Sequence, residues 1–245
     1  MPEIHLKLAW MYPDCLNLHG ERGNVQAFVR SGKRLGVRIT VDRIEYPEET
    51  VNFSAYDLLL FLPGELTMLS RLYPHLNKQL PALRQYLAEG GWLIATGTTG
   101  MLFGEGVLRE DGSKMPGLGL LPVTGKERQY VWGDDLHFRI RDTKQEIFGS
   151  QIQMVDVESK MPLGDVLYGR GNDAQGTEGA RMGNLIYTNC LGPVFVKNPW
   201  WTEQIIKDII LQKVGVRPAQ PHPLEDASFA SCLRFTENKP KFPNT

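Results

Sequence analysis

Short apolar runs recur through the first hundred residues and are separated by polar stretches. Runs at residues 5–11, 37–44, 57–62 and 92–95 have the length and composition of β-strands. The run at 57–62 is apolar from Leu58 onward, which is typical of a strand buried on both faces of a sheet. The pattern therefore predicts four strands, of which at least one is central.

A helical pattern of apolar positions fills two of the intervals between these strands. At residues 25–35 the apolar side chains fall on one face among basic residues, and Gly36 provides a stop signal. Residues 66–87 follow the same pattern, with kinks expected at Pro74 and Pro81. Strands that alternate with helices predict right-handed βαβ units and a doubly wound, mostly parallel sheet of the α/β class.

The second half of the chain has shorter β-like runs separated by turn residues. They fall at residues 120–123, 136–140, 152–157, 166–168 and 185–188. These runs predict strands that either extend the first sheet or form a second layer. A last helix is expected at residues 200–211.

The C-terminal residues change character again. Residues 217–223 are rich in proline and predict a linker, followed by a short helix near 226–234 and a disordered tail. We therefore expect one α/β domain over residues 1–213, a linker with a short helix over 214–235, and the tail over 236–245.

Composition and charge narrow the class of protein. Apolar residues make up 42% and charged residues 22%, as in folded globular proteins. With 27 basic and 28 acidic residues the net charge is −1, so no overall field attracts nucleic acid. The N-terminal residues lack the pattern of a signal peptide and no apolar run would span a bilayer. These features predict a cytoplasmic protein without membrane insertion.

Three cysteines are present, Cys15, Cys190 and Cys232, and they form no CxxC pair. An odd number of scattered cysteines favours reduced thiols over a disulfide framework or a zinc site. No other pattern indicates a metal ion or a cofactor.

Three motifs stand at positions where α/β proteins place ligand-binding loops. They are LNLHGERGN at residues 16–24, GLGLL at 117–121, and GRGND at 169–173, the last continuing to NLIYTNCLGP at 184–193. In order and spacing they resemble GatD, the glutaminase subunit of lipid II isoglutaminyl synthase, over nearly the whole chain. GatD belongs to the cobyric-acid-synthase-like (CobB/CobQ-like) class I glutamine amidotransferases. The resemblance implies their flavodoxin-like fold.

The chemistry of that family requires a cysteine and a histidine. A thiolate at a strand-to-helix turn attacks the glutamine amide, and a histidine on another strand transfers the proton. When residues 91–104 are matched to the family's elbow, Gly97 stands at the cysteine, and in the segment 189–193 Leu191 stands at the histidine. The resemblance thus predicts that both catalytic side chains are absent.

Other residues of the implied site have changed as well. The turn after the third strand reads LPGELTML at residues 62–69, without the family's charged run, and the glutamine-binding arginine falls at Val131. The remaining candidates for lining a ligand pocket are Arg22, Asn24, Gly64, Thr98, Thr99 and Arg128. Cys190 is a candidate for a displaced nucleophile, against the alternative that it packs at the end of a strand.

Three functions follow from the resemblance. The first is a subunit without glutaminase activity that forms a heterodimer with a MurT-like Mur ligase in peptidoglycan precursor metabolism. The second is an active glutaminase subunit that uses relocated residues such as Cys190. The third is a sensor whose empty pocket binds a small amino-acid-like ligand.

Overall fold

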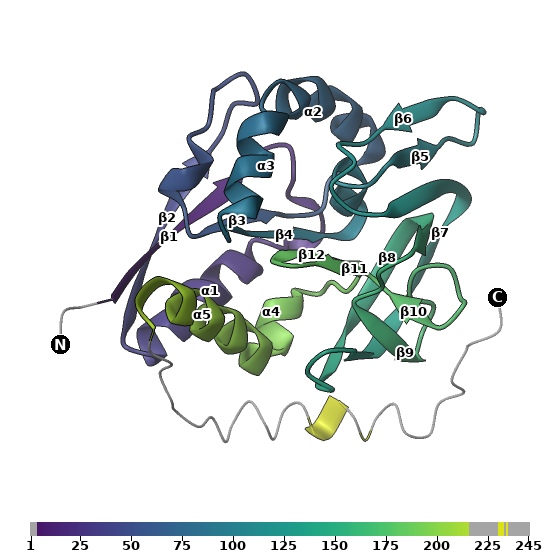
Figure 1. Ribbon diagram of the computed structural model, residues 1–245. Helices are drawn as coiled ribbons and strands as arrows, with labels where there is room; N and C mark the ends of the chain where they lie inside the picture. The colour runs from purple at the N-terminus through teal and green to yellow at the C-terminus, as the bar shows by residue number, and fades with distance from the viewer. Residues whose placement is uncertain (1–3, 216–229, 233, 235–245) are drawn as a thin grey trace.

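The computed structural model of the protein describes residues 4–215, 230–232 and 234, which form two β-sheets and the helices around them (Figure 1). The first sheet has the order β11-β12-β4-β3-β1-β2. Its strands are β1 (Ile4–Met11), β2 (Val37–Ile44), β3 (Leu58–Phe61), β4 (Trp92–Thr96), β11 (Ala180–Met182) and β12 (Leu185–Thr188). All neighbours are parallel except the edge strand β11. The predicted doubly wound sheet is confirmed.

Helices cover both faces of this sheet (Figure 1). On one face lie α1 (Gly23–Arg34), α4 (Val194–Lys197) and α5 (Pro199–Val214), and on the other α2 (Leu66–Lys78) and α3 (Leu80–Ala88). Successive residues of β3 point to opposite faces, so that Leu58 and Leu60 pack in one hydrophobic cluster and Leu59 in the other. Two separate cores therefore hold the sheet between its helices.

The prediction of one kinked helix over residues 66–87 is wrong in one respect. The chain forms two helices that are separated at Gln79, while Pro74 is accommodated inside α2. Pro81 stands in the first turn of α3, where a proline costs no hydrogen bond because the first amides of a helix have no partner. Pro81 therefore begins a helix and does not kink one.

The second sheet is built from the later strands and lies beside the first in Figure 1. Its order is β10-β9-β7-β5-β6, and β8 pairs with β7. The strands are β5 (Gly106–Leu108), β6 (Lys114–Pro116), β7 (Val123–Ile140), β8 (Glu146–Ser159), β9 (Gly164–Tyr168) and β10 (Thr177–Glu178). Both alternatives left open by the sequence thus occur, because β11 and β12 extend the first sheet and the other strands of this half form the second.

Three predicted runs in this half differ from the structure in their bounds. The run 120–123 is a strand only at Val123, and the runs 136–140 and 152–157 are parts of the much longer β7 and β8. The register of β7 and β8 also shifts between Glu127 and Trp132, which marks a bulge or irregularity in the pair.

The C-terminal predictions fall largely outside the described residues. This holds for the linker 217–223 and the tail 236–245, whereas residues 230–232 and 234 of the expected short helix are helical. The domain boundaries at 213 and 235 stay predictions. Among the described residues, no helix combines the length and apolar character needed to cross a bilayer.

Candidate functional site

The turn after β4 has the backbone shape of a nucleophile elbow. β4 ends at Thr96, and the 3-10 helix η3 (Gly97–Leu102) begins at the next residue. Gly97 has φ +60°, a left-handed conformation that connects the strand to the helix in one step. Enzymes that hold a nucleophile on such a strand-to-helix turn expose its side chain there. In this chain the turn has the same backbone shape, but Gly97 has no side chain to expose.

Leu191 and Pro63 fill the space beside Gly97. A Cβ atom added to Gly97 would lie 3.1 Å from Pro63 Cβ and 3.4 Å from Leu191 Cδ2. Leu191 is buried, and its segment is fixed to β8 because Leu191 N donates to Ser150 O (2.7 Å) and Ser150 N donates to Leu191 O (3.0 Å). The structure thus brings together the two positions at which cysteine and histidine were expected.

Cys190 points away from this pair. Adjacent residues of an extended segment project to opposite sides, and the Cys190 thiol packs against Gly149 within the hydrophobic cluster beneath α1 and α5. Burial, and after it the negative charge of Glu178, hold the pKa of the Cys190 thiol well above its usual range. A protonated, buried thiol is a poor nucleophile, so this placement argues against catalysis by Cys190.

The motif at residues 16–24 fastens the segment that carries Leu191. The buried carboxylate of Glu21 accepts hydrogen bonds from Gly192 N (2.7 Å) and from Asn24 Nδ2 (2.7 Å). Asn24 Oδ1 in turn accepts from Phe195 N (2.9 Å). Asn24 is therefore a structural connection between two loops, whereas Arg22 is exposed at the surface.

A cavity of about 390 Å³ opens beside the elbow. Its walls come from η1 (Leu18–Gly20), the turn before α2, the start of η3, the end of β5, and strands β7 and β8. The lining residues are Leu18, His19, Gly64, Glu65, Leu66, Thr67, Thr98, Arg109, Glu127, Val131, Ile152 and Met154. Of the predicted pocket residues, Gly64 and Thr98 line this cavity.

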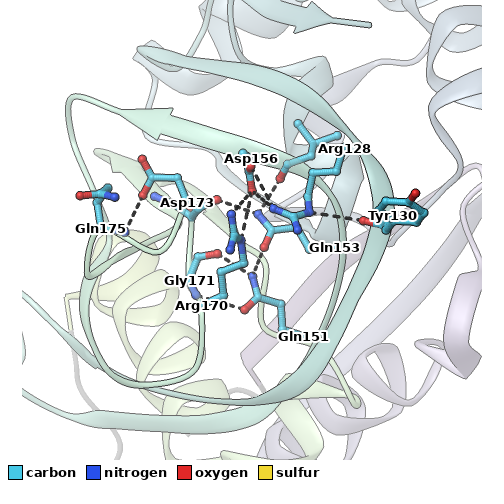
Figure 2. Close-up of polar contacts among 11 residues, drawn as sticks. Arg128, Tyr130, Gln151, Gln153, Asp156, Arg170, Gly171, Asp173 and Gln175 are labelled. Atoms are coloured by element: carbon cyan, nitrogen blue, oxygen red, sulfur yellow. Dashed lines mark hydrogen bonds and ion pairs between the residues drawn. The ribbon is translucent and has the colours of Figure 1, made fainter. Parts of the chain in front are cut away.

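Thr99 and Arg128 have other partners. Thr99 is buried and its hydroxyl donates to Leu62 O (2.7 Å), which ties η3 to the end of β3. Figure 2 shows Arg128 and Arg170 converging on Asp156, with Arg128 Nη1 at 2.9 Å and Arg170 Nη2 at 3.0 Å from Asp156 Oδ1. Neither Thr99 nor Arg128 lines the cavity.

Arg109 is a cavity residue that the sequence did not single out. It follows β5, and its Nε donates to Glu127 Oε2 (2.7 Å), which also accepts from Glu110 N (3.0 Å). The hydrogen bond from Arg109 lowers the pKa of the Glu127 carboxyl, which keeps this residue ionised. The cavity therefore contains an arginine although Val131 stands at the expected arginine position.

A second buried carboxylate lies behind the Leu191 segment. Glu178 is fully buried and accepts from the Thr188 hydroxyl (2.7 Å) and from Asn189 N (2.6 Å). Burial raises the pKa of Glu178 above its ordinary value of 4.5, although these hydrogen bonds oppose the shift. The polar residues at the end of β12 thus support the backbone that leads to Leu191.

The fold is shared with solved glutamine amidotransferases. The glutaminase domain of Trypanosoma brucei CTPS with bound acivicin superposes with a TM-score of 0.52 at 10% identity, covering 88% of this chain and 96% of that one. A glutamine amidotransferase from Thermotoga maritima gives a TM-score of 0.51 at 11% identity, covering 94% and 91%. The chain has the flavodoxin-like fold of class I glutamine amidotransferases.

Comparison with known sequences identifies more specific relatives within the glutamine amidotransferases. No protein-family model matches the chain. The lipid II isoglutaminyl synthase (glutamine-hydrolyzing) subunit GatD of Streptococcus pneumoniae (strain ATCC BAA-255 / R6) is 22% identical, covering 86% of this chain and 82% of that protein. GatD of Staphylococcus aureus (strain N315) is 25% identical, covering 85% and 84%. The chain is GatD-like.

Proposed function

We propose that this chain is a GatD-like subunit that does not hydrolyse glutamine and that supports a Mur-ligase-like partner in cell-wall precursor metabolism. The observation that carries the proposal is the contact between Gly97 and Leu191. The elbow keeps its backbone shape, but neither residue offers a nucleophile or a group that transfers a proton. Both losses fall at one place in the fold.

The loss matters because an amide is a poor electrophile. Its hydrolysis through a covalent intermediate needs an activated nucleophile and a nearby acid or base. In a serine protease, removal of the nucleophile alone lowers kcat by about 10⁶. A loss of similar size here would leave no useful turnover of glutamine.

The side chains near the elbow are poor substitutes. The Thr99 hydroxyl is used by Leu62 O, and the Cys190 thiol is buried on the opposite side of the segment. Thr98 lines the cavity, but no histidine partner of its hydroxyl is seen among the described residues. These contacts argue against an active glutaminase with relocated residues.

The partner is the second part of the proposal. The two GatD relatives are named as subunits of a synthase, so a complex with a MurT-like Mur ligase in the cytosol is the natural assembly for a GatD-like chain. Val131 (58% exposed) and Ile152 (39%) line the cavity, and Tyr130 (77%) precedes Val131 in the chain. These exposed apolar side chains offer a surface that such a partner would cover.

A small-molecule sensor is the second candidate function. The cavity of about 390 Å³ supports it, since this volume is within the range of ligand pockets, roughly 300–1,000 Å³. A sensor and a non-hydrolysing subunit are compatible, because a bound amino-acid-like ligand would then report on the pool of precursors to the partner.

One experiment separates these functions. The purified chain, alone and with a co-expressed MurT-like ligase, is incubated with glutamine, and glutamate is measured. The proposal predicts stable co-purification without glutamate above the level of the chain-free control. Glutamate release that disappears in Cys190→Ala would establish the relocated active site instead.

A further inference from the structure

Arg109 lines the cavity with part of its guanidinium available. Its Nε is occupied by Glu127, and no hydrogen bond from Nη1 or Nη2 to another described residue is seen. The side chain is 24% exposed, so its outer nitrogens reach the cavity from a half-buried position. A guanidinium held in this way presents a planar pair of donors that fits a carboxylate.

The cavity also contains acidic groups. Glu127 is engaged by Arg109, while Glu65 stands exposed at the start of α2, where it accepts from the Thr67 hydroxyl (3.3 Å). With one arginine and two glutamates, the lining carries a net charge of −1 when His19 is neutral. A ligand that is only anionic would meet this excess of negative charge, whereas a zwitterion matches both signs.

Apart from Glu127, the wall formed by β7 and β8 is apolar. Val131, Ile152 and Met154 line it, and Leu18 and Leu66 add apolar surface from the opposite elements. Val131 and Ile152 are 58% and 39% exposed, so a ligand side chain placed there would remove apolar surface from water. A terminal amide in the same position would lose its hydration to aliphatic groups that offer it no hydrogen bond.

We propose that this cavity binds an α-amino acid with an apolar side chain, about the size of leucine, and that Arg109 binds its carboxylate. The ammonium group faces the acidic side with Glu65, and the side chain packs on the β7–β8 wall. This inference rests on the proposed function, since a bound amino acid that is not hydrolysed acts as a ligand. It assigns carboxylate binding to Arg109, directly after β5, whereas the resemblance placed the glutamine-binding arginine at Val131.

Calorimetric titration of the full chain tests the proposal. L-leucine is compared with L-glutamine, with 4-methylpentanoic acid, which lacks the ammonium group, and with 3-methylbutylamine, which lacks the carboxylate. We expect leucine to bind at least about tenfold more tightly than 4-methylpentanoic acid and 3-methylbutylamine, because each lost charged contact is worth about that factor. Leucine should also bind more tightly than glutamine, whose terminal amide would lose its hydration on the apolar wall. Glutamine binding equal to or tighter than leucine, or no leucine binding, would overturn the proposal.

Two variants connect binding to the named residue. Arg109→Gln is expected to weaken leucine binding at least about tenfold. Arg128→Gln is the matched control and should leave binding unchanged, because Arg128 pairs with Asp156 outside the cavity. Arg109→Lys, which keeps the charge but loses the planar pair of donors, should give an intermediate affinity.

Circular dichroism and a urea unfolding curve establish that each variant is folded at the titration temperature. Leucine affinity that stays unchanged in folded Arg109→Gln would overturn the role of Arg109. The assay of glutamate release from glutamine, described under the proposed function, is evaluated independently of the binding titrations. Glutamate release refutes the proposed function whatever binds, and absent leucine binding without glutamate release refutes this inference alone.

Discussion

Leu191 lies directly against Gly97, so that a Cβ atom on the glycine would be 3.4 Å from Leu191 Cδ2. The two residues are 94 positions apart in the chain and reach each other because β12 pairs with β4 in parallel, with Thr188 opposite Thr96. The parallel pairing places both strand ends at the same edge of the sheet. An elbow without a side chain and an aliphatic residue thus stand where the family's chemistry needs a thiol and an imidazole.

Gly97→Ala tests how tightly the elbow is closed. The left-handed conformation costs a residue with a Cβ about 1–2 kcal/mol, and contact with Pro63 at 3.1 Å adds crowding. Gly183→Ala is the matched control, because Gly183 has φ +59° and nothing within 4 Å of an added Cβ. We expect urea unfolding to show a larger loss of stability for Gly97→Ala. Equal losses would mean that Pro63 and Leu191 do not confine the elbow.

Asn24→Ala tests the structural role of the motif at residues 16–24. The substitution removes the acceptor of Phe195 N and a donor to the buried Glu21, for an expected loss of about 2–4 kcal/mol. Gln26→Ala, at an exposed position of the same helix, should change stability by less than about 0.5 kcal/mol. Denaturant unfolding measures both, and a small effect at Asn24 would refute the connection.

Glu178 should make stability depend on pH. Because its pKa is raised in the folded protein, the folded state holds the proton more strongly than the unfolded chain. Its contribution is complete below the ordinary pKa of 4.5 and is lost as the pH rises through the folded pKa. In Glu178→Gln, the free energy of unfolding should therefore fall less steeply with pH above 4.5 than in the unchanged protein.

Other titrating groups are common to both proteins in that comparison. Burial also raises the pKa of Glu21 and lowers the pKa of His137, and these contributions cancel in the difference between the two curves. Parallel curves above pH 4.5 would show that Glu178 titrates normally in the folded protein.

The three thiols should differ in reactivity. Burial raises the pKa of both Cys190 and Cys15. Cys190 is also fully buried, so it should resist alkylation in the folded protein, whereas Cys15 and Cys232 are partly exposed. Limited treatment with iodoacetamide, followed by peptide mass spectrometry, measures the order of labelling. Labelling in urea is the control that all three can react. Rapid labelling of Cys190 in the folded protein would contradict its burial and would support Cys190 as a relocated nucleophile.

The sequence predicted the first sheet because its strands are short apolar runs bounded by clear turns. The pairing of the elbow with the Leu191 segment could also be anticipated, since the motifs at residues 91–104 and 184–193 keep the order and spacing of the family. What they could not indicate was how closely Leu191 packs against Gly97. That contact depends on the bridge between Leu191 and Ser150 in the second sheet.

Arg109 could not be found in the same way. It follows β5, a strand of only three residues, in a hairpin with β6 that has no extended alternating pattern. Arg128, three positions before Val131 in the chain, was the arginine that the sequence offered for the pocket near that position. Its partner Asp156 lies across the β7–β8 pair close to the register shift, and local sequence gives no signal for that pairing.

Covalent labelling with acivicin, an electrophilic glutamine analogue, tests the absence of a nucleophile most directly. The full chain, alone and with the MurT-like ligase, is treated and its intact mass is measured, with an active glutaminase as the control for the reagent. The account predicts no mass increase on this chain. A single acivicin adduct mapped to Cys190, Thr98 or another residue beside Gly97 would contradict it.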